Sequence, residues 1–346
     1  MWRTASWLLA SLLLVVESCD DNLTQMPDPE FRVDLAFIIA PFQPSSHGAA
    51  ELWAASLDGR VRPLFRQPGC QLASPAISPD GLRLVLRTCG EGGFSELLTV
   101  TAEGRNPRFL TRTMQPEDNP RWSPDGSKIA FEAHREGLWV LCSVDPDSGG
   151  ETVVASSPSM LALGDWSNDG KSLVFGERDD LWSVSLGSIA RTQLTSGPGR
   201  KRSPVWSPTD DSIAFLKGRR LCVVDRQGGG GREIELQADS LVPPLAWSYD
   251  GTFFLVTAWA DGRPDILRVM RDGSSVANLT RLLAPGSSPV LLPDKRQFAY
   301  VADLIDTRRM FLMDTDGLSN RMLMQVSLNE SSPAARRLRL PVSGGK

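Results

Sequence analysis

The sequence has few of the residues that carry out catalysis or bind metals. Its 346 residues include two histidines, His47 and His134. The motifs Gly-x-Ser-x-Gly, His-Glu-x-x-His and Cys-x-x-Cys do not occur, so the usual signs of a serine hydrolase, a zinc protease and a dithiol redox centre are missing. The sequence therefore predicts a protein that is not an enzyme and that needs no metal and no cofactor.

An excess of positive charge is also lacking. The formal net charge is −4 and the sequence pI is about 5.4. Proteins that bind nucleic acid generally carry clustered Lys and Arg side chains that neutralise phosphates. We therefore expect no nucleic-acid partner.

The apolar run at residues 5–16 follows Arg3 and is too short to span a bilayer as a mature helix. It leads to Ser18-Cys19, which resembles the bacterial lipoprotein signal, in which the cysteine is acylated and becomes the new N-terminus. We expect residues 1–19 to be a lipoprotein signal peptide with the lipid on Cys19, and residues 20–31 to be a polar tether. A secretory signal without a lipid is the alternative.

A phrase of about eight residues recurs through the rest of the chain. It occurs at residues 74–81, 119–126, 164–170, 203–208, 244–251 and 288–294. The position that is most often Trp in this phrase holds Ile77, Trp122, Trp166, Trp206, Trp247 and Leu291, which lie 40–45 residues apart. A period of this length with short β-type segments is typical of a β-propeller blade.

Each repeat contains the segments of a four-stranded blade. The phrase is followed by an apolar triplet such as Ile129-Ala130-Phe131, then by a third segment such as Leu138-Trp139-Val140, and then by a fourth such as residues 151–154. Pro-Asp-Gly and related turns separate the segments, because Pro presets φ and Gly accepts positive φ. The pattern predicts antiparallel strands rather than helices.

The N-terminal repeat lacks its first strand. Residues 35–37, 51–54 and 60–65 match the second, third and fourth strands, and residues 332–338 near the C-terminus could supply the missing one. Such a strand would close the ring and remove an open sheet edge. We therefore predict one propeller domain over residues 32–342, with seven blades; six blades with an N-terminal extension is the alternative.

Four further cysteines fall on predicted blades. Cys70 precedes the first strand of the second blade and Cys89 ends its second strand, so antiparallel pairing brings them to one face and a disulfide is geometrically plausible. The alternative is two unpaired surface thiols. Cys142 and Cys222 lie on third strands of separate blades, where we expect them to be buried and unpaired.

The repeats resemble the WD40-like PD40 repeat of the TolB family, which reads Pro-x-Trp-Ser-Pro-Asp-Gly-x-x-Ile-Ala-Phe. Residues 120–131 match this pattern, and residues 204–215 match it outside the turn. TolB itself is a soluble periplasmic protein with an α/β domain before a six-bladed propeller, and it binds a peptidoglycan-associated lipoprotein. The stretch between Cys19 and Leu35 is too short for such a domain, so we expect a TolB-like propeller lipoprotein.

Comparison between repeats separates packing positions from candidate binding positions. The recurring Trp residues occupy fixed registers and are interpreted as core packing between blades. Residues that change from blade to blade, beside the connections between blades, form a candidate rim for binding a partner. This rim consists of Asp118, Asn119, His134, Asp165, Arg178, Arg202, Trp259 and Asp303. Trp259 stands out, because an exposed Trp is a favoured interface anchor.

Three functions remain compatible with this sequence. The first is a monomeric, lipid-anchored scaffold of the bacterial periplasm or cell envelope that binds a protein; the resemblance implies a peptidoglycan-associated lipoprotein as the kind of partner. The second is a propeller hydrolase or lyase that acts on glycans or lactones, which would place carboxylates with shifted pKa values around the channel. The third is a structural subunit of a surface complex.

Overall fold

The computed structural model describes residues 33–39, 50–209, 211–304, 307–324 and 334–335. All of them belong to one compact unit, Arg32–Lys346. These residues are mainly strands, with one short helix, η1 (Glu91–Gly93). The predicted signal peptide, its Cys19 and the tether lie outside the described residues. Within the described part of the chain, no helix has the length and apolar character needed to cross a membrane.

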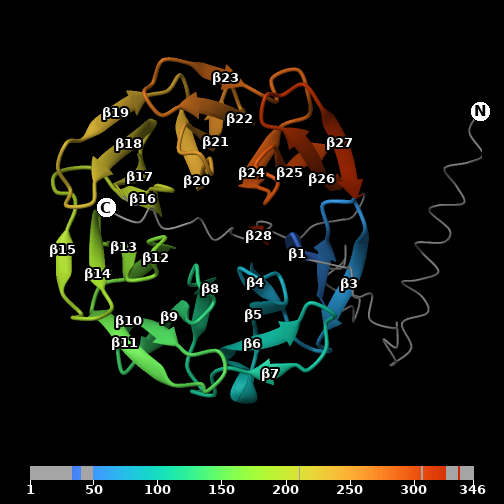
Figure 1. The fold of residues 1–346 in the computed structure, drawn as a ribbon, viewed down its shortest axis with the longest axis vertical. Coiled ribbons are helices and arrows are strands. Elements are labelled where there is room, and N and C mark those ends of the chain that lie inside the picture. The colour runs from blue at the N-terminus through green and yellow to red at the C-terminus, as the bar shows by residue number, and fades with distance from the viewer. Residues whose placement is uncertain (1–32, 40–49, 210, 305–306, 325–333, 336–346) are drawn as a thin grey trace, which may run out of the picture. The chain divides into compact units, whose positions relative to one another are not determined.

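The strands form seven sheets of four, each antiparallel, which follow one another around a common centre (Figure 1). Blade 1 contains β28 (Ala334–Ala335), β1 (Leu35–Ile39), β2 (Glu51–Ala55) and β3 (Val61–Arg66), and blade 2 contains β4 (Ala73–Ile77), β5 (Arg83–Cys89), β6 (Ser95–Thr101) and β7 (Arg108–Phe109). Blade 3 contains β8 (Glu117–Trp122), β9 (Ile129–Arg135), β10 (Leu138–Val144) and β11 (Glu151–Ser157). Blade 4 contains β12 (Leu161–Trp166), β13 (Ser172–Glu177), β14 (Asp180–Ser185) and β15 (Arg191–Gln193).

The remaining blades repeat this order. Blade 5 contains β16 (Lys201–Trp206), β17 (Ser212–Lys217), β18 (Arg220–Asp225) and β19 (Arg232–Glu235). Blade 6 contains β20 (Ser240–Trp247), β21 (Phe253–Ala260), β22 (Arg263–Met270) and β23 (Val276–Asn278). Blade 7 contains β24 (Gly286–Leu291), β25 (Gln297–Leu304), β26 (Thr307–Asp314) and β27 (Asn320–Met324). The prediction of a seven-bladed propeller is confirmed, and the six-bladed alternative is wrong.

The ring closes between the two ends of the described chain. In β28, Ala335 is paired with Leu35 and Ala334 with Ala36 of β1, in antiparallel register. β28 also contacts β4 of blade 2 and β24 of blade 7. Blade 1 therefore takes its innermost strand from the C-terminal region, as the sequence predicts. The other residues of the predicted strand 332–338 lie outside the described residues.

The Ser-Pro-Asp-Gly phrase forms the hairpin between the first and second strands. In blade 3, Ser123 Oγ donates to Asp125 Oδ1 (2.6 Å) and accepts from Lys128 N (2.9 Å), and Gly126, at φ 74°, donates to Ser123 O (2.9 Å). Partial burial would raise the pKa of Asp125, but the hydrogen bonds from Ser123 and Ser127 hold it below its ordinary value. The same turn recurs around Ser78, Ser167 and Ser248.

The hydrophobic core lies mainly between neighbouring blades. One cluster combines Leu141 and Val154 of blade 3 with Trp166 and Phe175 of blade 4, which are each at most 1% exposed. Two of the recurring Trp residues also donate a hydrogen bond to the preceding blade: Trp122 Nε1 to Ala76 O (3.2 Å) and Trp166 Nε1 to Arg121 O (2.9 Å). The interpretation of the recurring Trp residues as packing is confirmed by their burial.

The free cysteines belong to this core. Cys142 on β10 and Cys222 on β18 are buried and unpaired. Burial raises the pKa of Cys142 to about 12 and that of Cys222 to about 11. Neither thiol ionises near neutral pH, in agreement with the expectation of inert side chains.

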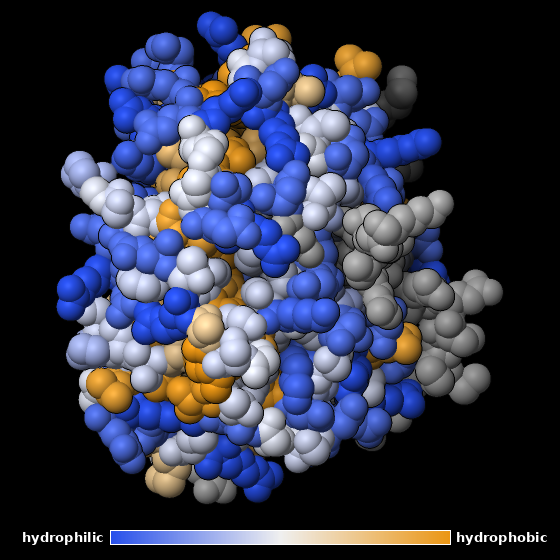
Figure 2. Space-filling model, turned by 60° about the vertical axis from the view of Figure 1, so that its left-hand side comes forward, coloured by the Kyte–Doolittle hydropathy of each residue, from blue (hydrophilic) through white to orange (hydrophobic). Residues whose placement is uncertain are grey.

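The two faces of the propeller differ in the segments that they carry. One face carries the hairpins between second and third strands, such as residues 135–138 and 177–180, and we call it the connection face. It also carries the links between blades, such as residues 158–160. We call turn face the opposite one, which carries the Ser-Pro-Asp-Gly hairpins. On the side drawn in Figure 2 the surface is mostly hydrophilic, with hydrophobic side chains in separate patches.

Candidate functional site

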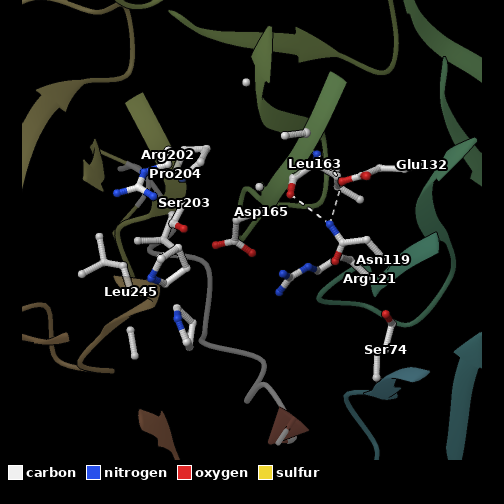
Figure 3. A pocket seen from close by; sticks show the side chains of 18 of the residues that line it. Ser74, Asn119, Arg121, Glu132, Leu163, Asp165, Arg202, Ser203, Pro204 and Leu245 are labelled. Carbon is white, nitrogen blue, oxygen red and sulfur yellow. Dashed lines mark hydrogen bonds between the residues drawn. The ribbon is translucent and has the colours of Figure 1, made fainter. Parts of the chain in front are cut away.

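A channel of about 1250 Å³ lies at the centre of the ring. Its lining comes from the innermost strands of blades 2 to 7, namely β4, β8, β12, β16, β20 and β24, and from loops at the connection face. Figure 3 shows side chains from several blades around this opening. A concave site of this kind is the default place to look for a binding function.

One register of the innermost strands forms a ring around the channel. The residue that precedes each Trp-type position lines the cavity, because side chains alternate along a strand and the Trp side chain points into the core. The six members are Ala76, Arg121, Asp165, Val205, Ala246 and Val290. Four of these six described members are small or apolar. The charged ones are Arg121 of blade 3 and Asp165 of blade 4.

A β-bulge near this register fixes the backbone of the innermost strands. The pairing with the second strand shifts between Asp118 and Arg121 in blade 3, and at the matching place in blades 2, 4, 5, 6 and 7. Asn119 (φ 53°) and Ser203 (φ 51°) adopt the left-handed conformation there, each directly before a proline. Because the bulge recurs from blade to blade, it belongs to the repeat and re-aims side chains toward the channel.

The two carboxylates deepest in the channel hold neighbouring blades together. Glu132 on β9 accepts hydrogen bonds from Asn119 Nδ2 (2.8 Å) and from Leu163 N of blade 4 (2.7 Å). Asp165 accepts from its own blade at Trp166 N (2.9 Å) and from Trp206 N of blade 5 (3.1 Å). Burial raises the pKa of Glu132, and its hydrogen bonds oppose that rise.

Arginine side chains gather where the channel opens on the connection face. Arg178 lies in the hairpin between β13 and β14, Arg200 directly precedes β16, and Arg202 lies on β16. Lys201 N donates to Asp179 O (3.1 Å), which brings these segments of blades 4 and 5 together. We call Arg178, Arg200 and Arg202 the arginine mouth.

The far end of the channel has a different character. Toward the turn face its lining includes Pro79, Pro208, Asn168 and Tyr249. None of these side chains is charged near neutral pH. Positive charge is therefore concentrated at the connection-face end.

The predicted rim residues separate into two groups. Asn119, Asp165, Arg178 and Arg202 line the channel. Asp118 lies next to it, where it accepts from Ser74 Oγ (2.6 Å) and pairs with Arg87 at 3.5 Å. Asp165 differs from the expectation, because it lies within the channel at the ring register and not at the rim.

The other three predicted residues lie on the connection face away from the channel lining. His134 contacts the Trp139 ring, with 5.2 Å between centroids. Asp303 pairs with Arg308 across the β25–β26 hairpin (2.8 Å). Trp259, near the end of β21, is 42% exposed. Their positions make them candidates for contact with a large partner rather than with a molecule inside the channel.

The comparison between the repeats of this chain did not identify Arg121, Glu132 and Arg200 as channel residues. Arg121 could have been found from strand alternation, because the position before each Trp varies between blades and must face away from the core. Glu132 directly follows an apolar triplet and gives no such signal, since its place in the channel depends on the bulge. Arg200 lies in an irregular link between blades, which no periodicity describes.

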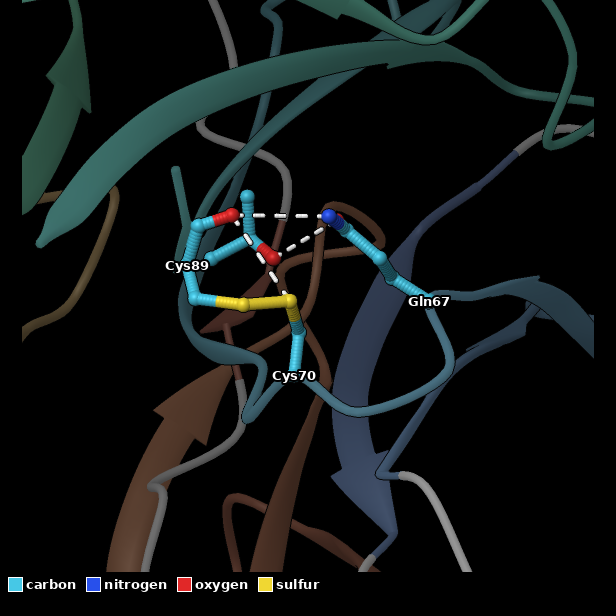
Figure 4. Close-up of a disulfide and its surroundings, with 4 residues drawn as sticks. Gln67, Cys70 and Cys89 are labelled. Carbon is cyan, nitrogen blue, oxygen red and sulfur yellow. Dashed lines mark hydrogen bonds between the residues drawn. A yellow bond between two sulfur atoms is a disulfide. The ribbon is translucent and has the colours of Figure 1, made fainter. Parts of the chain in front are cut away.

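A disulfide fixes the connection face of blade 2. Cys70, in the link from β3 to β4, is joined to Cys89 at the end of β5, with 5.4 Å between their Cα atoms (Figure 4). Gln67 supports the same link, since it accepts from Thr88 Oγ1 (2.7 Å) and donates to Cys89 O (3.4 Å). The bridge closes a loop across 19 residues. A disulfide that closes a loop of that size stabilises the folded state by roughly 3 kcal/mol, because it lowers the conformational entropy of the unfolded chain.

Within the described residues, no group of three or more His, Cys, Asp or Glu side chains is placed to hold a metal ion. The Asp314–Gly317 segment, which resembles a calcium loop in sequence, forms the β26–β27 turn. Gly317 N donates to Asp314 O there (2.8 Å).

Comparisons with known proteins agree with the architecture. The TolB β-propeller domain family, PD40, matches residues 42–184. A TolB homologue of Chlorobium luteolum is 24% identical over 249 residues, which cover 70% of this chain and 57% of that protein. This chain is a β-propeller similar to TolB. It spans about half the length of the curated relatives that it matches first.

Solved structures of other propellers share the fold of this TolB-like chain. TolB from Acinetobacter baumannii superposes with a TM-score of 0.55 at 17% identity, over 84% of this chain and 80% of that one. An oligogalacturonate lyase in complex with manganese gives a TM-score of 0.63 at 15% identity, over 87% and 88%. At such identities the likeness establishes the fold alone.

Proposed function

We propose that this TolB-like propeller is a non-enzymatic scaffold of the bacterial cell envelope, anchored by a lipid on Cys19, that binds a protein partner on its connection face. The TolB homologue among its relatives supports the envelope and the partner-binding role. The arrangement of the channel carboxylates supports the non-enzymatic role. Glu132 and Asp165 each accept hydrogen bonds from backbone N–H groups of the next blade.

The distribution of exposed apolar side chains carries this proposal. Among the described residues, the large hydrophobic side chains that are exposed on the connection face are Phe94, Met114, Leu138, Met160, Val242, Trp259, Leu282 and Leu283. Those exposed on the turn face are Leu82, Ile189 and Leu318, and Val153, Val276 and Met322 are exposed on the outermost strands β11, β23 and β27. Exposed apolar groups rimmed by polar residues mark protein interaction sites, and Trp is the most favoured anchor in such sites.

Paired substitutions test which face binds. The partner is first identified by crosslinking the full chain in the envelope of cells that express it and by mass spectrometry of what is attached. We expect Trp259→Ala to lower capture of that partner by about tenfold or more, since a buried interface Trp often contributes about 2 kcal/mol or more. The matched control is Leu318→Ala, which removes an apolar side chain that is 88% exposed on the turn face.

Two further measurements complete the test. Both variants should retain the wild-type melting temperature, because neither side chain belongs to the core. Cys19→Ser should move the chain from the membrane fraction to the soluble fraction. Equal capture by wild type and Trp259→Ala, or a loss confined to Leu318→Ala, would contradict the choice of face.

A further inference from the structure

The arginine mouth holds positive charge that no described carboxylate neutralises. Arg178 Nε donates to Ser159 Oγ (3.0 Å), and Arg202 Nη2 donates to Leu241 O (3.1 Å), so both contact neutral groups. Within the described part of the chain, no salt bridge involves Arg178, Arg200 or Arg202. A guanidinium carries five N–H donors, so several remain available at each of these residues.

Neighbouring charges do not cancel this excess. The Lys201 ammonium is already bound by Asp180 Oδ1 (2.7 Å) and Gly197 O (2.6 Å). Asp179 is the acidic residue that lines the mouth beside the three arginines. Deeper in the channel, Arg121 projects into the opening (Figure 3). The mouth therefore keeps a net positive charge in a chain whose formal net charge is −4.

Some arginines elsewhere in the chain are paired with carboxylates. Arg191 is paired with Glu177 on the outer part of blade 4, and Arg220 with Glu233 on blade 5 (3.0 Å). Surface pairs of this kind contribute little to stability, but they leave no cation free for a ligand. Arg112, Arg281 and Arg296 are likewise in none of the salt bridges of the described residues, so the mouth is distinguished by the gathering of three such arginines around one opening.

We propose that the partner binds by placing an acidic peptide segment, with two or more carboxylates, in the channel opening against Arg178, Arg200 and Arg202. This inference depends on the proposed function, since it specifies the chemistry of the protein that the connection face recognises. Guanidinium groups bind carboxylates through paired N–H···O hydrogen bonds, and a recessed opening weakens competition from water.

Two observations favour a peptide over an anionic glycan. Met160 lines the opening and is 52% exposed, and Trp259 lies on the same face, so the surface combines charge with apolar anchors as protein interfaces do. Sugar rings commonly stack on open aromatic faces, whereas the Trp residues around this channel are at most 8% exposed. At the arginine mouth a glycan would find charge without an exposed Trp face, since the partly exposed Tyr249 lies at the far end of the channel.

The test uses a fluorescein-labelled hexaglutamate peptide as a direct probe, measured by fluorescence polarisation with the full chain. We expect binding at low salt that weakens strongly at about 0.5 M salt, because screening at that concentration acts over a few ångströms. Arg178→Gln and Arg200→Gln should each weaken binding by about fivefold or more. Arg202 is left intact, since its bond to Leu241 O links blades 5 and 6.

The matched control is Arg296→Gln, which removes one positive charge from the β24–β25 hairpin on the turn face. It should change the affinity for hexaglutamate by less than about twofold, because it is remote from the mouth. A hexalysine peptide should not bind. Failure of hexaglutamate to bind, or an equal loss in Arg296→Gln, would overturn the proposal. Tighter binding of oligogalacturonate than of hexaglutamate would also overturn it, in favour of an anionic glycan.

Capture of the crosslinked partner separates this inference from the proposed function. Loss of capture with Trp259→Ala, together with unchanged capture with Arg178→Gln and Arg200→Gln, would support the connection face as the binding surface. It would contradict the inference that the partner binds through an acidic segment. Unchanged capture in all of these variants would contradict the proposed function itself. Loss of capture in all of them, with Arg296→Gln unaffected, would support both.

Discussion

Gly104→Ala is expected to destabilise the propeller far more than Gly149→Ala, although both glycines occupy the same kind of turn. Gly104 lies in the β6–β7 turn with φ 75°, and Gly149 in the β10–β11 turn with φ 74°. A Cβ at Gly104 would be 1.7 Å from the backbone oxygen of Leu64 in blade 1, whereas a Cβ at Gly149 would meet nothing within 4 Å. The difference between the variants therefore isolates the contact between blades.

Both substitutions place an L-residue at a positive φ, which lowers the free energy of unfolding by about 1–2 kcal/mol. Gly104→Ala adds displacement of a neighbouring backbone, for which overpacking costs of about 1–3 kcal/mol are typical. Denaturant unfolding followed by tryptophan fluorescence measures both values. Equal unfolding midpoints for the two variants would show that blades 1 and 2 do not approach each other as described.

Deletion of residues 334–346 is expected to open the ring. It removes β28, so that β1 loses its neighbour and presents an unpaired edge. It also uncovers part of a core cluster that contains Leu35 and Phe37, which are now at most 2% exposed. We expect a loss of several kcal/mol, since each large apolar side chain returned to water costs about 1.5–3 kcal/mol.

Thermal unfolding and dye binding reveal this opening. The deleted chain should melt at lower temperature, less cooperatively, and should bind a hydrophobic dye that the full chain does not bind. Deletion of residues 339–346, which follow the predicted strand, serves as the control and should leave the melting temperature nearly unchanged. Identical melting of all three chains would mean that β28 does not close the ring.

The fold could be predicted from the sequence because its signals are local and repeated. A Ser-Pro-Asp-Gly turn specifies its own hydrogen bonds, and the apolar triplet after it specifies a buried strand whichever blade it belongs to. Six copies of the turn phrase and seven of the triplet determine the seven blades. Even the strand exchange follows, since a first strand is missing at one end and a candidate lies at the other.

The channel could be predicted in part. Arg178 and Arg202 were found because they vary between repeats at positions near the connections. Asp165 was placed at the rim, because its depth depends on a bulge that no sequence pattern marks in blade 4, where Gly164 takes the place of the proline. The charge state of the mouth could not be predicted, since it depends on which carboxylates of neighbouring blades come within reach.

The connection face as the binding surface can be tested most directly by site-specific photo-crosslinking in cells. A photoreactive phenylalanine analogue is placed at Met160, beside the arginine mouth, and in a second chain at Leu318 on the turn face. Both positions are exposed, so folding should be preserved in each. We predict a crosslinked partner from position 160 and none from position 318; the reverse result would contradict the account.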